Sequence, residues 1–340
     1  MNRVFVHGIG SVSPAGWGIA SLRDPLASGD PCQTTDLQQP GNRGPLTVRR
    51  VPPPDPKPAY FSHPRMRRGC PVAQYAAGAA LEALGQDAAT ASAGSYSLGV
   101  ISCAFSGCVS YSRRFYQETL SEPQTASPLI FPETVFNAPA SHLSAILGVS
   151  GSNYTLVGDQ AEFLKALALG ASWLVQRIVD GCVIVAAEEL DWLTAGALQL
   201  FEPGVCATEG AGAIYLRREQ SAVELVCITK PQLYDRRRGR VGALYSFTWP
   251  PHLKGTASDL LCDGLVGVQA VDANESELWR DWPGTRLSPR EVLGEGFAAS
   301  GAWQVVAGID ALRQPSSNRS FVAVAGSNEQ IVGAVFERVG

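Results

Sequence analysis

The stretch 155–189 constrains the fold more than any other part of the sequence. A short apolar segment reaches a tight turn at residues 158–161, and apolar residues then recur at near-helical spacing, as in a mostly buried helix. These apolar residues are Phe163, Leu167, Ala171, Leu174 and Ile178. Asp180-Gly181 ends the predicted helix, and the uninterrupted apolar run 182–187 is typical of a central strand covered on both faces.

A strand, a sharp turn and a buried helix together form a nucleophile elbow, in which the residue at the turn is exposed at the positive N-terminus of the helix. A Cys or Ser is expected at that position when the elbow serves covalent catalysis. This chain has Glu162 there. The stretch therefore predicts the architecture of an elbow without its nucleophile.

The composition describes a well-buried globular protein. The chain has 340 residues, 45% of them hydrophobic and 17% charged, which is enough for one large domain or two medium ones. A net charge of −4 gives no electrostatic case for binding nucleic acid. No apolar run reaches the roughly 18–20 residues of a membrane span, and residues 1–10 do not resemble a signal peptide.

The eight cysteines are scattered, with no CxxC pair, and most lie in apolar runs. This pattern favours reduced thiols in a cytoplasmic protein, and we predict no metal and no cofactor. The strand at 3–10 runs into a Gly-rich turn, but Ser13 stands three residues after Gly10, where a GxGxxG phosphate loop requires glycine. A dinucleotide site is therefore not predicted.

Residues 22–62 are rich in Pro, Gly, Asp and Gln and are expected to form an extended surface excursion. The arginines at 65, 67 and 68 then precede an Ala-rich helix predicted over 71–85. They have two interpretations: a binding patch for an acidic carrier protein or a phosphate, or a solvated start to the helix.

Residues 97–104 predict a buried strand, and the long region 105–140 follows it. Phe131 and Phe136 in that region are candidates for a pocket, an interface or the core. Further strands are predicted at 209–216 and 222–229, and two more within 321–336. The chain thus divides into two α/β halves, residues 1–218, with an insertion at about 105–140, and residues 219–340.

Several motifs together resemble the β-ketoacyl synthases of the thiolase-like fold. Asp159-Gln160-Ala161-Glu162 stands in the frame of the family's Asp-Thr-Ala-Cys elbow, and residues 209–213 match its Glu-Gly-Ala-Gly-Ala strand. Residues 294–302 resemble its Gly-His-x-x-Gly-Ala-Ala-Gly-Ala helix start, and Gly326-Ser327-Asn328 resembles its closing turn. The resemblance implies an α/β, thiolase-like fold with duplicated halves in α-β-α-β-α layers.

The resemblance also implies where catalytic residues would stand, and this chain lacks them. Glu162 takes the place of the cysteine, Glu295 that of one histidine and Arg290 that of the lysine. The second histidine belongs to a loop whose nearest match is 261–267, around Gly264, and no histidine occurs there. His252 is a possible displaced substitute, although its flanks read as a surface turn.

These replacements remove the chemistry of decarboxylative condensation. That reaction needs a thiolate to carry the acyl chain and imidazole donors to stabilise an enolate. A carboxylate at Glu162 is physically sensible as an anion at a helix N-terminus, and Arg290 is expected to pair with Glu162 or with Glu295. The resemblance therefore favours a subunit that is not an enzyme by itself.

Within the family, this pattern resembles chain-length factors, in which the elbow cysteine is often Gln. The expected role is a non-catalytic partner of an active ketosynthase in a 3-oxoacyl-carrier synthase complex of fatty acid, polyketide or polyene biosynthesis. The expected partners are that ketosynthase, in a heterodimer, and an acyl carrier protein. Alternatives are a malonyl-carrier decarboxylase, an acyltransferase using another thiol such as Cys103, and a scaffold or binding protein.

The resemblance also implies an obligate dimer that buries more than about 2,000 Å². The apolar strand 97–104 and the insertion 105–140 are the segments expected to supply its surface.

Overall fold

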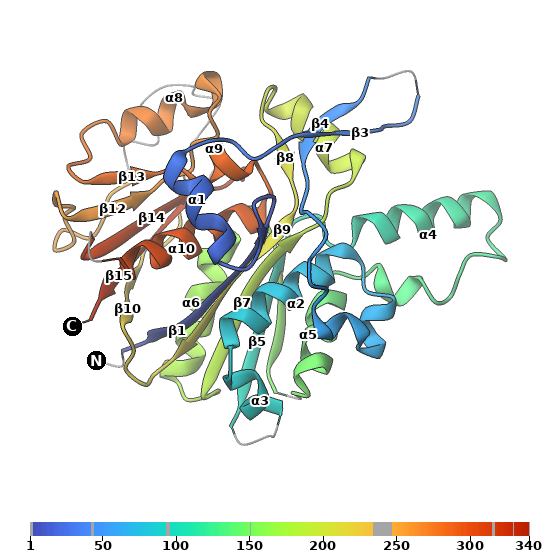
Figure 1. Ribbon diagram of the computed structural model, residues 1–340, viewed down its shortest axis with the longest axis horizontal. Helices are drawn as coiled ribbons and strands as arrows, with labels where there is room; N and C mark the ends of the chain where they lie inside the picture. The colour runs from blue at the N-terminus through green and yellow to red at the C-terminus, as the bar shows by residue number, and fades with distance from the viewer. Residues whose placement is uncertain are drawn as a thin grey trace.

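The structure is a computed structural model that describes residues 3–41, 44–92, 96–149, 151–233, 247–314, 317–328 and 330–339. One large mixed sheet runs through the molecule, and helices lie on both sides of it (Figure 1). Among the helices in these ranges, none is both long and apolar enough to span a bilayer.

The first half of the chain contains the elements up to β9. They are β1 (Phe5–Ser13), β2 (Gly16–Trp17), α1 (Ala20–Ser28), β3 (Thr35–Leu37), β4 (Leu46–Arg49), α2 (Pro71–Leu84), α3 (Asp87–Ser92), β5 (Leu98–Ala104), α4 (Val109–Ser121), α5 (Ala138–Leu147), β6 (Asn153–Val157), α6 (Glu162–Val175), β7 (Gly181–Glu188), α7 (Trp192–Phe201), β8 (Ala207–Thr208) and β9 (Gly210–Arg217). Short 3₁₀ turns lie at Ala59–Ser62, Pro64–Arg67 and Phe131–Glu133.

The second half contains the remaining elements. They are β10 (Val223–Ile228), β11 (Gln232–Leu233), β12 (Asp259–Cys262), α8 (Gln269–Leu278), β13 (Thr285–Leu287), α9 (Pro289–Leu293), α10 (Ala298–Leu312), β14 (Arg319–Ala325) and β15 (Gln330–Arg338). The strands expected within 321–336 are β14 and β15, and the strand expected at 222–229 is β10.

The sheet topology repeats once along the chain. In the first half, β1 pairs antiparallel with β9, β9 antiparallel with β7, and β5 and β6 continue in parallel. In the second half, β10, β15, β14, β12 and β13 follow the same order with the same strand directions. The duplicated α/β fold is therefore confirmed, and β1 joins the halves by pairing with β10. A boundary between residues 218 and 219 is consistent with this repeat and remains our proposal.

Helices α6 and α10 occupy equivalent places in the two halves: the strand after each, β7 or β14, has a parallel neighbour on one side and an antiparallel neighbour on the other. They pack against each other in the largest core cluster, together with residues from the strands of both halves. Helices α2 and α5 pack against β5, β7 and β9 in a second cluster, on the other face of the first half (Figure 1). The layered arrangement thus places α6 and α10 at the centre of the molecule.

The helix after the elbow is shorter than its apolar spacing predicts. It ends at Val175, and Arg177 adopts a left-handed φ of 58°, which terminates a right-handed helix. Ile178 consequently lies outside the helix and is 49% exposed, so its expected place on the buried face is wrong. The strand that follows, β7, is buried along its whole length, as predicted.

Two further expectations need correction. The excursion 22–62 begins within a helix, α1, because Leu22 is buried and anchors this helix to the core. The apolar strand β5 is not at a sheet edge: it is hydrogen-bonded to β7 on one side and β6 on the other, so it supplies no free surface. Among the described strands, β6 is at this end of the sheet order and β13 is at the other.

Candidate functional site

The elbow between β6 and α6 is tied to the second half of the chain by its own polar side chains. Asp159 Oδ2 accepts a hydrogen bond from the backbone N–H of Asn328 at 2.7 Å. Gln160 Oε1 accepts from the N–H of Ser327 at 3.1 Å, and its Nε2 donates to Ser327 Oγ at 3.4 Å. Both side chains are buried. The turn therefore links the two halves of the chain through these two side chains.

Glu162 is the first residue of α6, and its side chain lies apart from these bonds. Lys165 Nζ, one turn along the helix, is 3.1 Å from the Glu162 carboxylate. A negative charge in the first turn is favourable because the helix dipole is positive there. The prediction of a structural anion at this helix N-terminus is thus consistent with an ion pair inside the helix itself.

Helix α10 closes over the elbow at a glycine. A Cβ built on Gly301 would lie 2.0 Å from the carbonyl oxygen of Gln160. Any side chain at position 301 would therefore push the two central helices apart. The turn that leads into α10 contains Phe297, which has a strained φ of 46° and stacks on Phe105 with ring centroids 4.6 Å apart.

Three of the four sequence-predicted site positions meet in a second buried cluster. The guanidinium of Arg290, on α9, forms an ion pair with the Glu295 carboxylate and donates to the carbonyl oxygen of Gly264 at 2.8 Å. Arg290 and Glu295 are both buried. Of the two pairings expected for Arg290, the structure has the one with Glu295. Glu162 instead forms its ion pair with Lys165, on α6 itself.

Acidic side chains on α8 hold the loop around Gly264. Glu275 Oε1 accepts from the Gly264 N–H at 2.7 Å, and Asp272 accepts from the N–H groups of Val266 and Val268 at 2.9 and 3.0 Å. Burial raises the pKa of Glu275 to about 7, and the negative charge of Asp263 adds to the effect. The Glu275 carboxyl group, near the positive Arg290, is therefore partly protonated at neutral pH.

The raised pKa of Glu275 gives a testable pH dependence. Its folded pKa of about 7 exceeds the ordinary 4.5, so its contribution to stability is complete below 4.5 and is lost as the pH rises toward 7. At about 1.4 kcal/mol per pKa unit, the loss amounts to a few kcal/mol. Glu275→Gln should flatten the fall in unfolding free energy, measured by denaturant titration across this range. An identical pH slope in wild type and variant would contradict the assignment.

Among the described residues, no histidine takes part in the hydrogen bonds given above for the elbow or for the Arg290 cluster. Of the four histidines, His7, His63 and His142 bond to other partners, and His252 is exposed. The nearby thiol of Cys103 lies in β5, where burial raises its pKa well above the ordinary value and the charges of Glu162 and Glu188 raise it further. A buried neutral thiol is a poor nucleophile.

Phe131 and Phe136 lie on the surface rather than in the core, at 56% and 41% exposure. Sequence reasoning missed Gln160 and Glu275 as site residues. The signal for Gln160 was its position in the tight turn, directly before the helix. Glu275 is eleven residues from Gly264 in the sequence, and this separation gives no periodic signal.

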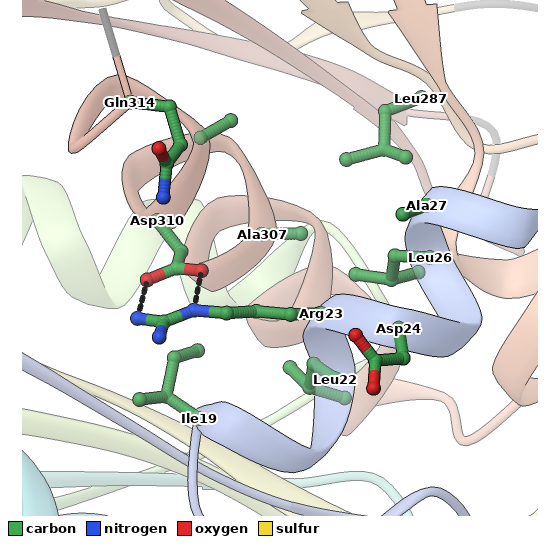
Figure 2. A pocket seen from close by; sticks show the side chains of 11 residues that line it. Ile19, Leu22, Arg23, Asp24, Leu26, Ala27, Leu287, Ala307, Asp310 and Gln314 are labelled. Atoms are coloured by element: carbon green, nitrogen blue, oxygen red, sulfur yellow. Dashed lines mark hydrogen bonds and ion pairs between the residues drawn. The ribbon is translucent and has the colours of Figure 1, made fainter.

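A cavity of about 340 Å³ lies elsewhere, between α1 and the C-terminal half of α10 (Figure 2). Its walls are mainly apolar, and Arg23 reaches across one end to Asp310 through two hydrogen bonds of 2.9 Å (Figure 2). None of the residues described above for the elbow or the Arg290 cluster lines this cavity.

The sequence matches no protein-family model and no curated protein. Solved structures nevertheless share its fold. The ishigamide ketosynthase/chain length factor has a TM-score of 0.78 at 17% identity, covering 99% of this chain and 100% of that one. A β-ketoacyl synthase from Burkholderia phymatum has a TM-score of 0.78 at 16% identity, with both chains fully covered.

A type II polyketide synthase ketosynthase, solved in complex with its acyl-carrier protein, has a TM-score of 0.74 at 15% identity, covering 99% of each chain. At these identities the likeness establishes the fold alone. The chain has the thiolase-like fold of the β-ketoacyl synthases, as its motifs predict.

Proposed function

We propose that this chain is a non-catalytic ketosynthase-like subunit, of the chain-length-factor type, that pairs with an active ketosynthase. The observation that carries the proposal is the buried Arg290–Glu295 ion pair at the positions where the resemblance places a lysine and a histidine. An anionic carboxylate there repels an enolate instead of stabilising it. The pair makes this cluster a structural element rather than a catalytic one.

The elbow supports the same proposal in either of two registers. The sequence frame puts Glu162 at the cysteine position, whereas the buried side chain aimed at the second half is Gln160. We propose Gln160 as the equivalent of the cysteine, because chain-length factors often have Gln there. Neither side chain can form a thioester, so the conclusion does not depend on the choice.

The proposed partner surface is the edge of the sheet at β6. Strand β6 ends the sheet order, and its Tyr154 and Val157 are each 55% exposed. Apolar edge strands in stable proteins are normally covered. The end of the 105–140 insertion lies beside it: Asn137 and Ser141 line one hollow together with Asn153 and Tyr154. Phe131 and Phe136 extend this surface, which we call the edge surface (Phe131, Phe136, Tyr154, Val157).

The proposed occupant of the edge surface is the catalytic ketosynthase homologue, which has the same fold and therefore a matching edge strand. An acyl carrier protein is the second proposed partner. The arginines at 65, 67 and 68 are exposed next to the start of α2, and acidic carrier proteins are attracted to such groups. The buried Met66 between them anchors the patch to the core.

Co-expression with a candidate ketosynthase, followed by co-purification, tests the proposal. Wild type should form a stable heterodimer, and Tyr154→Lys with Val157→Lys should weaken it at least tenfold, because each places a charge in a desolvated interface at a cost of about 1.4 kcal/mol or more. Leu233→Lys is the matched control, since Leu233 is a 75% exposed side chain on β11, far along the sheet order from β6.

The double variant should keep its far-ultraviolet circular dichroism and its melting temperature, because both side chains are exposed. A wild-type chain that stays monomeric at micromolar concentration with the partner present would contradict the proposal. So would a double variant that binds as tightly as the Leu233 control.

A further inference from the structure

Two cysteines lie side by side at the starts of helices α2 and α4. Cys70 precedes the first residue of α2, and Cys108 precedes the first residue of α4. Both residues are 1% exposed, and their sulfur atoms lie 3.1 Å apart. This separation is only about 1 Å longer than the roughly 2.05 Å of a disulfide bond.

A second set of contacts holds the same two helix starts together. The Glu189 carboxylate accepts hydrogen bonds from the N–H and Oγ of Ser110, both at 2.7 Å, and from the N–H of Val72 at 3.4 Å. Glu189 thus bridges the first turns of α4 and α2 independently of the sulfur atoms. The two thiols are therefore held close together by the surrounding backbone, and closing the bond requires the sulfur atoms to approach by about 1 Å.

The Cys70–Cys108 pair lies at the base of helix α4. Helix α4 has no buried residue, and it projects away from the body of the molecule (Figure 1). Cys108 lies at the base of this arm, 38 residues from Cys70 in the sequence. A covalent bond at this point fixes the base of the arm to the central layers, whatever the tip of the arm contacts.

We propose that Cys70 and Cys108 form a reversible disulfide that responds to hydrogen peroxide. One thiol attacks the peroxide, its S–O bond forms as the O–O bond breaks, and one water leaves. The second thiol then attacks that sulfur, the S–S bond forms as the S–O bond breaks, and a second water leaves. The two thiols lose two electrons and two protons, and the peroxide is reduced to two waters. A dithiol reductant reverses the reaction by thiol–disulfide exchange.

The burial of both sulfur atoms sets the expected behaviour. The hydrogen bond that Cys70 donates to Cys108, together with burial, raises the pKa of Cys70, so the thiol is neutral and its oxidation should be slow. Once one sulfur is oxidised, however, the other is already in contact, so single-site over-oxidation should not accumulate. Cys182 and Cys262 are equally buried in strands and serve as internal controls.

The test uses the full chain treated with hydrogen peroxide and then alkylated under denaturing conditions. We expect loss of two free thiols per chain, a mass decrease of two hydrogen atoms, and one cross-linked peptide joining residues 70 and 108. Tryptic cleavage of the arm at Arg113 and Arg114 should slow in the oxidised protein and recover with dithiothreitol. Cys70→Ser and Cys108→Ser should each abolish the cross-link and leave the other cysteine open to sulfinic acid formation.

Either of two results would overturn the proposal. One is wild-type protein in which both thiols stay free after prolonged peroxide treatment that oxidises the partly buried Cys32, Cys206 and Cys227. The other is single oxidation of Cys70 or Cys108 to a sulfinic acid without the cross-link. Neither outcome depends on whether the chain pairs with a ketosynthase.

Discussion

Replacing Arg290 by alanine should destabilise the protein by about 3–5 kcal/mol, the usual cost of removing one partner from a buried ion pair. The change leaves the Glu295 carboxylate buried without its cation, and it removes the donor to the Gly264 carbonyl. The Glu275 carboxyl group would also lose the positive charge that lowers its pKa. Denaturant unfolding at neutral pH measures the effect.

Two controls separate this charge effect from simple loss of a side chain. Arg23→Ala removes an ion pair to Asp310 in which the arginine side chain is 46% exposed, so it should cost only about 0–1 kcal/mol. Glu295→Gln placed in the Arg290→Ala background should recover part of the loss, because it removes the uncompensated negative charge. An Arg290→Ala variant as stable as Arg23→Ala would mean that the cluster does not hold the loop.

The central layers were predictable because their residues are buried on all sides. Continuous apolar runs identify β5, β7 and β9 as interior strands without further context. The edge strand β6 was harder to identify, since only its pairing with β5 distinguishes it from a loop of similar composition. The partner surface was assigned to β5 because this strand is apolar. An apolar strand is expected to be buried, but the sequence does not say whether a neighbouring strand or a second chain buries it.

Part of the site was predictable from local spacing in the sequence. Arg290 lies on the short helix α9 and Glu295 lies just after it, five residues along the sequence. A local ion pair could therefore be inferred from the sequence. The bonds from Gln160 to Ser327 span 167 residues, and no local pattern encodes such a contact. The sequence frame places Glu162 at the cysteine position, whereas the structure turns Gln160, two residues earlier, toward the second half. The choice between them depends on where the helix begins, and helix boundaries are hard to assign from sequence.

A glycine contact explains why the elbow keeps its shape without a nucleophile. Gly301 lets α10 approach the Gln160 carbonyl oxygen, and Asp159 and Gln160 bond to the turn at Ser327 and Asn328. These contacts connect the two halves of the fold at its centre. The elbow therefore has a structural role that does not depend on catalysis, as the proposed non-catalytic subunit requires.

The most direct test is condensation by the reconstituted complex, with acyl loading of each chain followed by intact-protein mass spectrometry. Replacing the elbow cysteine of the partner ketosynthase should reduce turnover by several powers of ten, because the only thioester is lost. Glu162→Ala and Gln160→Ala in this chain should leave turnover within an order of magnitude, and Glu162→Ala should cost only about 0.5–2 kcal/mol of stability.

Glu162→Cys and Gln160→Cys should not restore turnover to a complex without the partner's cysteine, because no imidazole stands at Gly264 or Glu295. Our account predicts acyl adducts on the partner and none on this chain. An acyl adduct on the wild-type chain, or turnover that survives removal of the partner's cysteine, would contradict it.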